Sequence, residues 1–276
     1  YGGELELAWS FSSQLFERST VGGLADAYAE ELRALVAHCC QEHHRGVTPS
    51  DFPLAGLTQA QLDSLPVPAL QVGDIYPLSP MQQGMLFYSA QGAEGGIYIN
   101  QTSVAVEGLV IERFVEAWNF VIARHDILRT GFWSAAHLAQ PLQIVHRHLD
   151  LPIRVLDWRD RTVTQEALEA LAAAESGEAF DMMSAPLMRV ILVRLDDHRM
   201  QLIWTRHHIL MDGWSSSRLF GEVLQFYSTG QVTGENGRYR DFIAWLQAQD
   251  QDAQELFWKA RLAVVNEPTA LSQAMH

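Results

Sequence analysis

The sequence predicts an α/β fold, a two-layer sandwich in which helices cover a mixed sheet. First, stretches with apolar residues at helical spacing alternate along the chain with short apolar runs typical of strands. Second, the apolar runs at 187–195 and 199–206 are separated only by Asp196-Asp197-His198, which indicates a hairpin. Third, no internal repeat of solenoid period and no low-complexity tract occurs. Helices and strands that alternate with hairpins favour packed layers around one core.

Length and composition are those of a globular protein. With 276 residues, of which 48% are hydrophobic, the chain can bury a large core in one domain or two. It contains no run of about 18 apolar residues, so no transmembrane span is predicted. It begins at Tyr1 without a signal-like leader, and we expect it to be an excised fragment.

Charge and cysteine content restrict the partners and the setting. The net charge of −14 argues against nucleic acid or an anionic membrane surface as the main partner, because both attract positive charge. The only cysteines, Cys39 and Cys40, are adjacent and poorly placed to form a disulfide, so we expect a reducing, cytoplasmic setting. Their position at a helix end predicts that they belong to its buried face.

The first part of the chain predicts one strand, one helix and a linker. Apolar alternation predicts a strand at 4–10, and Thr20 is the expected N-cap of a helix that extends to about His43. One strand and one helix cannot bury their own apolar faces, so this piece needs a partner. Prolines and short polar residues mark 46–73 as an extended linker, with a short helix at 58–65 because Thr58 and Gln61 have capping-box spacing.

A strong helix start opens the next block. Ser79 as N-cap, Pro80 at the first helical position and Gln82 at the third predict a helix that Gly92 can end. Within it, three apolar side chains share one face: Met81, Met85 and Tyr88. Periodicity alone predicts the remaining elements: strands at 98–106, 143–145 and 153–156, and helices at 111–125, 163–176 (closed by Gly177), 215–227 and 239–262, the last with aromatic residues in the core.

The segment 206–215 carries the chemistry-bearing pattern His-His-x-x-x-Asp-Gly. A strand precedes it, a helix follows it, and Asp212-Gly213 forms the turn between them. Consecutive side chains on a strand point to opposite faces, so only one of His207 and His208 can face a reaction channel. The other is expected to make a structural hydrogen bond. From these residues alone, a catalytic and a structural role both remain open.

Other kinds of site find little support. His146 and His148 share a face if they lie on a strand, but no Cys-x-x-Cys or His-Glu-x-x-His pattern completes a zinc site, so we expect no metal. Ser79 and Ser215 lack the Gly-x-Ser-x-Gly elbow of serine hydrolases. Gly-x-Gly-x-x-Gly and Walker loops are absent, which argues against a bound nucleotide.

Three segments in order resemble the first three core motifs of a non-ribosomal peptide synthetase condensation domain: 76–85 (Tyr-Pro-Leu-Ser-Pro-Met-Gln-Gln-Gly-Met), 124–130 (Arg-His-Asp-Ile-Leu-Arg-Thr) and 207–215. The family's segment before the active-site hairpin is also matched, by Phe180-Asp181 and residues 186–189. In the second motif, Asp126 replaces the glutamate that is usual in the family. The resemblance implies that 74–276 is the N-terminal lobe of such a domain, with a chloramphenicol acetyltransferase-like fold and the second lobe missing. The family's active site lies between two lobes, so this fragment alone is expected to be inactive.

Residues 1–45 resemble the C-terminal end of an epimerization or condensation domain, and 46–73 resemble the interdomain linker that follows one. This order implies that the domain accepts a D-configured donor. The reaction implied is peptide-bond formation between two carrier-bound thioesters. The resemblance implies that no cofactor is bound directly, because upstream and downstream peptidyl carrier domains supply phosphopantetheine. Adjacent epimerization and adenylation domains are the other implied partners. An epimerization domain, a coenzyme A-dependent acyltransferase of the same fold and an inactive carrier-binding fragment remain alternatives.

The resemblance also implies roles for individual residues. His208 is the general base or positioning group, and His207 makes a structural hydrogen bond. Asp212 holds the motif through an ion pair with an arginine, and Gly213 leaves room for the carrier arm. Further residues are implied by motif position alone: Trp214 and Ser215 in substrate binding, and Ser79, Gln82, Arg124, His125 and Arg129 in motif structure.

Overall fold

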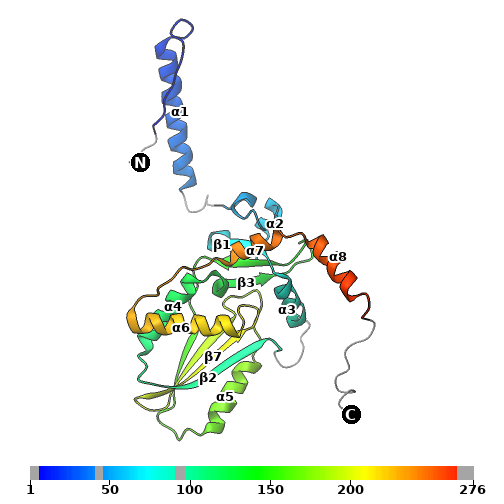
Figure 1. The fold of residues 1–276 in the computed structure, drawn as a ribbon. Helices are drawn as coiled ribbons and strands as arrows, with labels where there is room; N and C mark the ends of the chain where they lie inside the picture. Colours follow the sequence, from blue (N-terminus) through cyan, green and yellow to red (C-terminus); the bar gives the residue numbers. More distant parts are fainter. Residues whose placement is uncertain (1–5, 41–45, 91–96, 266–276) are drawn as a thin grey trace. The chain divides into compact units, whose positions relative to one another are not determined.

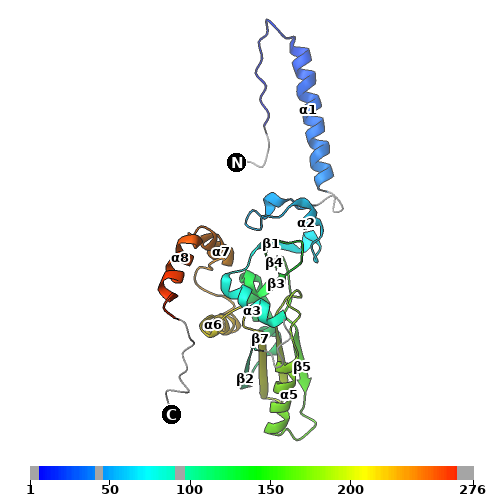
Figure 2. The same ribbon diagram turned by 90° about the vertical axis from the view of Figure 1, so that its right-hand side faces the viewer.

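A computed structural model of the chain describes residues 6–40, 46–90 and 97–265 (Figures 1 and 2). The chain divides into two compact units, Tyr1–Thr48 and Pro49–His276. None of the described helices is long and apolar enough to cross a membrane.

The first unit is dominated by helix α1 (Arg18–Cys39). The predicted strand is wrong for residues 6–10, which have no strand pairing, while 4 and 5 lie outside the described residues. The helix starts after Glu17, so Thr20 lies in its first turn and is not its N-cap. No residue of α1 is buried, and Cys39 and Cys40 are both exposed thiols, which corrects their predicted burial. A lone helix offers these side chains no second layer to pack against.

The second unit begins with a segment that was predicted as an extended linker but is folded from Pro49 onward. Helix α2 (Gln59–Asp63) starts with the predicted capping box: Gln61 N donates to Thr58 Oγ1 (3.3 Å), and Thr58 N donates to Gln61 Oε1 (2.9 Å). Five apolar side chains of this segment are buried: Phe52, Ala55, Leu57, Leu62 and Val72. Their burial explains why the segment is not extended, since apolar area removed from water stabilises a fixed conformation.

Two sheets form the framework of the second unit. The first has three antiparallel strands in the order β1 (Val72–Pro77), β4 (Leu142–His146) and β3 (Thr130–Trp133). The second has four strands in the order β2 (Ile99–Glu107), β7 (Arg199–His207), β6 (Met188–Arg194) and β5 (Ile153–Asp157). Strands β5 and β6 are parallel and the other pairs antiparallel, so the predicted α/β fold with a mixed sheet is confirmed.

Helices pack on the four-stranded sheet (Figure 2). Helices α4 (Ile111–Arg124) and α6 (Gly213–Thr229) contact each other over the main core, where Trp118, Trp204 and Val223 are buried. The neighbouring Ile203 belongs to a second cluster, with Leu168 of helix α5 (Gln165–Gly177). Consecutive residues of a strand face opposite sides, so α5 covers the other face of β7.

Helix α3 (Pro80–Ala90) starts with the predicted capping box, because Gln82 N donates to Ser79 Oγ (3.3 Å) and Ser79 N donates to Gln82 Oε1 (3.0 Å). Its buried face differs from the sequence expectation: Gln82 and Leu86 are buried, whereas Met81 and Tyr88 are largely exposed. Gly92, the predicted end of this helix, lies outside the described residues.

The predicted C-terminal helix is two helices, α7 (Tyr239–Gln247) and α8 (Gln251–Leu262). Asp250 interrupts it, because its carboxylate accepts from Ala253 N (2.9 Å) and caps the second helix. The aromatic side chains were predicted to be core, yet Ile243 is the only buried residue of the two helices, and Trp245 and Trp258 are more than half exposed. Periodicity therefore identified the apolar face correctly, but the described part of the chain leaves it exposed.

Candidate active site

The His-His-x-x-x-Asp-Gly segment lies where β7 runs into α6 (Figure 1). His207 ends the strand, and a tight turn follows in which Leu210 N donates to His207 O (3.3 Å) and Met211 N donates to His208 O (3.2 Å). Gly213 is the first residue of α6. The turn places the two imidazoles in different surroundings, as strand alternation predicts.

His207 is buried and His208 is only partly buried. Ile209 N donates to His207 Nδ1 (3.1 Å), and His207 Nε2 lies 3.1 Å from Ser89 Oγ. Burial, and after it the neighbouring His208, lower the pKa of His207 to about 4. The ring is therefore neutral at physiological pH and bonded at both nitrogens, so it has no nitrogen left for a substrate.

His208 retains a free nitrogen. Its Nδ1 lies 3.0 Å from Met211 O and 3.1 Å from the amide nitrogen of Asn100. A carbonyl can only accept, so Nδ1 carries the hydrogen, and the Asn100 amide must turn its oxygen toward the ring. Among the described residues, none forms a hydrogen bond with Nε2 of His208. This nitrogen is therefore the one able to take up a proton from a substrate.

Asp212 caps helix α6. Its Oδ1 accepts from Ser215 N (2.7 Å). This backbone hydrogen bond is the main cause of the lowered pKa of the Asp212 carboxyl, and a hydrogen bond from the Ser215 hydroxyl lowers that pKa further. The resemblance implied an ion pair with an arginine, but no arginine in the described part of the chain forms one with Asp212. Arg206 instead reaches the turn indirectly, since its Nε donates to Ser216 Oγ (3.1 Å), which donates to Asp212 O (2.7 Å).

Three further motif residues face outward at the start of α6. A Cβ on Gly213 would meet no atom within 4 Å, so its lack of a side chain leaves room on the outer side of the turn. Trp214 is 78% exposed, and Ser215 is also exposed. These residues are thus accessible to a substrate and are not held by packing within this chain.

Ser79 and Gln82 link the first motif to the histidine turn. Gln82 Nε2 lies 3.4 Å from Ile209 O and 3.1 Å from Gln143 Oε1, while Gln143 Nε2 donates to Pro77 O (3.0 Å). Both glutamines are buried, so this amide pair holds the turn from the side of α3. Sequence reasoning missed Gln143; its only signal was a polar residue in the short apolar strand 142–146.

The residues of the second motif connect elements of the scaffold. His125 Nε2 lies 2.7 Å and Arg124 Nε 3.3 Å from Glu222 Oε2, which ties α4 to α6. The guanidinium of Arg129 is buried and bonds Asp126 Oδ1 (2.7 Å) and the carbonyl groups of Ile122, Ala123, His146 and Arg147. Among the described residues, neither Arg124, His125 nor Arg129 forms a hydrogen bond or ion pair with the segment 207–215.

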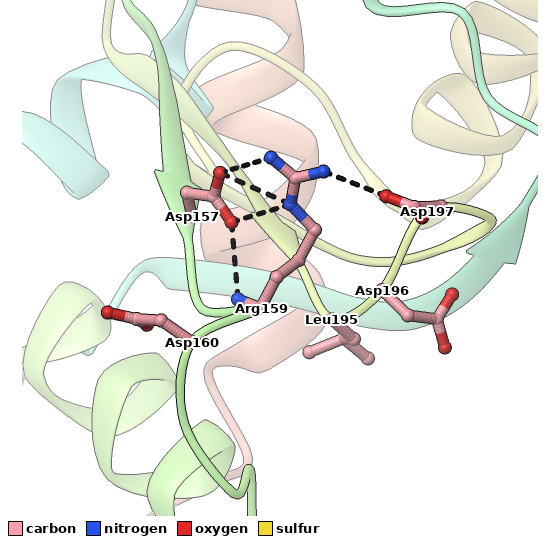
Figure 3. A pocket seen from close by; sticks show the side chains of 6 residues that line it. All are labelled: Asp157, Arg159, Asp160, Leu195, Asp196 and Asp197. Carbon is pink, nitrogen blue, oxygen red and sulfur yellow. Dashed lines mark hydrogen bonds and ion pairs between the residues drawn. The ribbon is translucent and has the colours of Figure 1, made fainter.

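A pocket of about 660 Å³ lies at the opposite end of β7, around the hairpin turn (Figure 3). Arg159 stands between two acids there, with Nη2 2.7 Å from Asp157 Oδ2 and Nη1 2.8 Å from Asp197 Oδ1. Asp196 closes the hairpin by accepting from the backbone of His198 (2.9 Å), and this bond helps to lower the pKa of its carboxyl to about 2. The pocket is thus separated from the histidines by the length of β7, and its arginine is already paired.

The described residues contain no group of three or more His, Cys, Asp or Glu side chains arranged to hold a metal ion. His146, considered above as a zinc ligand, has a buried Nε2 without a hydrogen-bond partner, and burial lowers its pKa.

The chain is similar to proteins of one known family. The family described as Condensation domain matches residues 72–274. A linear gramicidin synthase of Brevibacillus parabrevis is 37% identical over 276 residues, which is 97% of this chain and 5% of that protein. A mycosubtilin synthase of Bacillus subtilis is 35% identical over 93% of this chain and 10% of that protein. The starter condensation domain of rhizomide synthetase shares the fold, with a TM-score of 0.63 and 24% identity over 71% of this chain and 50% of that one.

Proposed function

Because the chain belongs to the condensation-domain family of non-ribosomal peptide synthetases, we propose that it supplies one lobe of a domain that forms a peptide bond between two carrier-bound substrates. The chain spans a small part of its curated relatives and half of the matched solved domain, so the proposed activity is that of the complete domain. The observation that most supports this proposal is that Nε2 of His208 has no hydrogen-bond partner among the described residues. The turn that carries His208 is held by Gln82 of α3 on one side and by the Asp212 cap of α6 on the other.

In the proposed reaction, the amine nitrogen of the acceptor attacks the carbonyl carbon of the donor thioester. The carbon–sulfur bond breaks, and the donor arm leaves as a thiol. The α-amine has a pKa of about 8 and loses a proton as the amide forms. His208 Nε2 accepts this proton or positions the amine, and the proton ends on the departing sulfur. Holding both substrates in place contributes up to about 7–11 kcal/mol in favourable cases.

The partners follow from this reaction. Upstream and downstream peptidyl carrier domains deliver both substrates on phosphopantetheine arms, and an adenylation domain loads the acceptor. The exposed start of α6, at Gly213 and Trp214, supports a carrier arm approaching there. The exposed thiols of Cys39 and Cys40 are consistent with a reducing, cytoplasmic setting.

We further propose that residues 1–45 are the end of a preceding epimerization or condensation domain, that 46–73 connect the two domains, and that the donor is D-configured. In support, the alignment with the linear gramicidin synthase covers 97% of the chain, so the relative continues upstream of the condensation match at residue 72. Helix α1, in which no residue is buried, also fits a piece that belongs to another domain.

The test uses the complete condensation domain with loaded donor and acceptor carriers. We expect His208→Ala to lower the rate of peptide-bond formation at least 100-fold, within the range for loss of a general base, while carrier loading is unchanged. His198→Ala, at the exposed hairpin turn, is the matched control and should retain the full rate.

Two outcomes would contradict the proposal. A His208→Ala variant as fast as the unaltered domain would remove His208 from the reaction. Exchange of the α-proton of a loaded donor in the absence of any acceptor would indicate an epimerization domain instead. Donors of both configurations decide the subtype: the D-donor should react at least tenfold faster than the L-donor.

A further inference from the structure

His207 can carry its hydrogen on only one nitrogen. Its Nδ1 lies 3.1 Å from Ile209 N, and a backbone N–H can only donate. Nδ1 is therefore an acceptor, and the neutral ring carries its hydrogen on Nε2. The ring is 4% exposed, with Tyr98 and the edge of Phe180 at 6.1 and 6.5 Å between ring centres, so water does not offer it an alternative partner.

Ser89 of α3 is the group that receives this hydrogen. Its Oγ lies 3.1 Å from His207 Nε2 and 2.8 Å from Met85 O. The Met85 carbonyl can only accept, so the serine hydrogen points to Met85 and the serine lone pair accepts from the histidine. The hydrogen bonds thus run in one direction, from His207 to Ser89 to Met85, and this direction is compatible with one tautomer only.

Helix α3 consequently holds Ile209 at both of its backbone groups. The N–H of Ile209 is fixed through His207 and Ser89, and its carbonyl lies 3.4 Å from Gln82 Nε2. Gln82 and Ser89 are seven residues apart, two helical turns on the same face of α3. Ile209 directly follows His208, so a shift of the Ile209 backbone would also move the backbone that carries the His208 ring.

From this geometry we infer that Ser89 is a positioning residue, which selects the Nε2–H tautomer of His207 and thereby holds His208 in its working orientation. The inference rests on the proposed function and assigns a role to a residue outside the His-His-x-x-x-Asp-Gly segment. Without the Ser89 hydroxyl, the buried Nε2–H of His207 has no hydrogen-bond acceptor. The His207 ring can avoid this unsatisfied donor only by changing tautomer or by rotating. Either change releases the Ile209 N–H and loosens the turn.

The kinetic test compares Ser89→Ala with Ser89→Thr in the complete domain. In the alanine variant we expect about a tenfold lower single-turnover rate at saturating carriers, in line with partners that orient functional histidines elsewhere. The half-saturating carrier concentration should stay unchanged, because the residue does not touch the substrate. Threonine keeps the hydroxyl and its bond to the preceding helical turn, so it should restore the rate to within about threefold.

Ser228→Ala is the matched control, because Ser228 Oγ makes the same kind of bond to a carbonyl four residues earlier (Leu224 O, 2.9 Å). Among the described residues it forms no hydrogen bond with a histidine. This variant should leave the rate unchanged. An alanine variant at position 89 with the full rate, a threonine variant as slow as alanine, or an equal loss in Ser228→Ala would overturn the inference.

Nitrogen-15 NMR of the histidine rings separates this inference from the proposed function. In the unaltered 276-residue chain, the signal that disappears in His207→Gln should show a protonated Nε2 and an unprotonated Nδ1. In Ser89→Ala that pattern should shift toward the other tautomer or a mixture. If the complete domain makes no peptide bond but the shift occurs, the proposed function fails and the role of Ser89 stands. An unchanged tautomer in Ser89→Ala would disprove the role of Ser89 by itself.

Discussion

At the scale of single residues, the neighbouring His207 and His208 have different chemical roles because their surroundings differ. Both ring nitrogens of His207 form hydrogen bonds, and burial lowers its pKa to about 4, whereas Nε2 of His208 has no hydrogen-bond partner among the described residues. Strand alternation predicted this division, but not the partners that enforce it. Ser89, Gln143 and Asn100 come from three other elements, and their spacing along the sequence carries no sign of the site.

The low pKa of His207 predicts a pH-dependent stability. The ordinary pKa of histidine is 6.5, so the unfolded chain binds more protons than the folded one between pH 6.5 and about 4. The stabilisation from the neutral ring is complete above pH 6.5 and is lost as pH falls toward 4. It amounts to at most about 3 kcal/mol, from about 1.4 kcal/mol for each unit of pKa.

We therefore expect urea unfolding of the 276-residue chain to show a free energy of unfolding that falls more steeply from about pH 6.5 to about pH 4.5 than in His207→Gln. His198→Gln, at an exposed position, should keep the steep dependence. Equal slopes in the unaltered chain and His207→Gln would show that the ring is not held neutral by the fold.

At the scale of elements, the site is assembled where a strand, a turn and two helices meet. Helix α3 holds the turn through Gln82 and Ser89, and α6 starts under the cap of Asp212. In strand β3, the backbone of Gly131 lies so close to the backbone of Met183 that a Cβ on Gly131 would be 2.5 Å from Met183 O, so this position requires glycine. Capping and turn signals predicted α2 and α3 well, since a cap depends on residues three positions apart. Strands β1 and β3 were missed, because β1 contains turn-forming residues and β3 has only four residues.

The cap predicts how α6 responds to changes at Asp212. Asp212→Ala should lower the free energy of unfolding by about 1 kcal/mol, whereas Asp212→Asn should cost only a few tenths, because an amide oxygen can also accept from Ser215 N. Chemical unfolding measures both. Asp250→Ala removes the corresponding cap of α8 and serves as the control, with no loss of activity expected in the complete domain. If Asp212→Asn is as unstable as Asp212→Ala, the carboxylate has a role beyond capping.

At the scale of the whole molecule, much apolar surface on the described helices is exposed to solvent. Helices α1 and α8 bury no residue, and α8 presents Leu256, Phe257 and Trp258 to solvent. Exposed apolar area of this kind marks surfaces that belong against another body. The matched part covers 50% of the solved domain of the same fold, so a complete domain of that length has further chain that can lie against such surfaces.

We accordingly expect the 276-residue chain alone to form no peptide bond with loaded carriers, although it keeps His208 and the whole turn. A site with one wall cannot hold two tethered substrates together or exclude water. Mass spectrometry of the acceptor carrier after single-turnover incubation measures the product, with the complete domain as positive control. Turnover by the short chain at the rate of the complete domain would show that one lobe suffices.

The amino-acid sequence by itself determined the α/β class, most helices and strands, the capping boxes of α2 and α3, and the three motif segments. Each of these depends on local spacing, which a linear sequence displays directly. Tertiary structure alone decided that Nε2 of His208 has no hydrogen-bond partner among the described residues, and that Ser89 and Gln143 hold the histidine turn. These properties arise from contacts between residues up to 127 positions apart in the chain, as for Gln82 and Ile209, and local spacing contains no record of them.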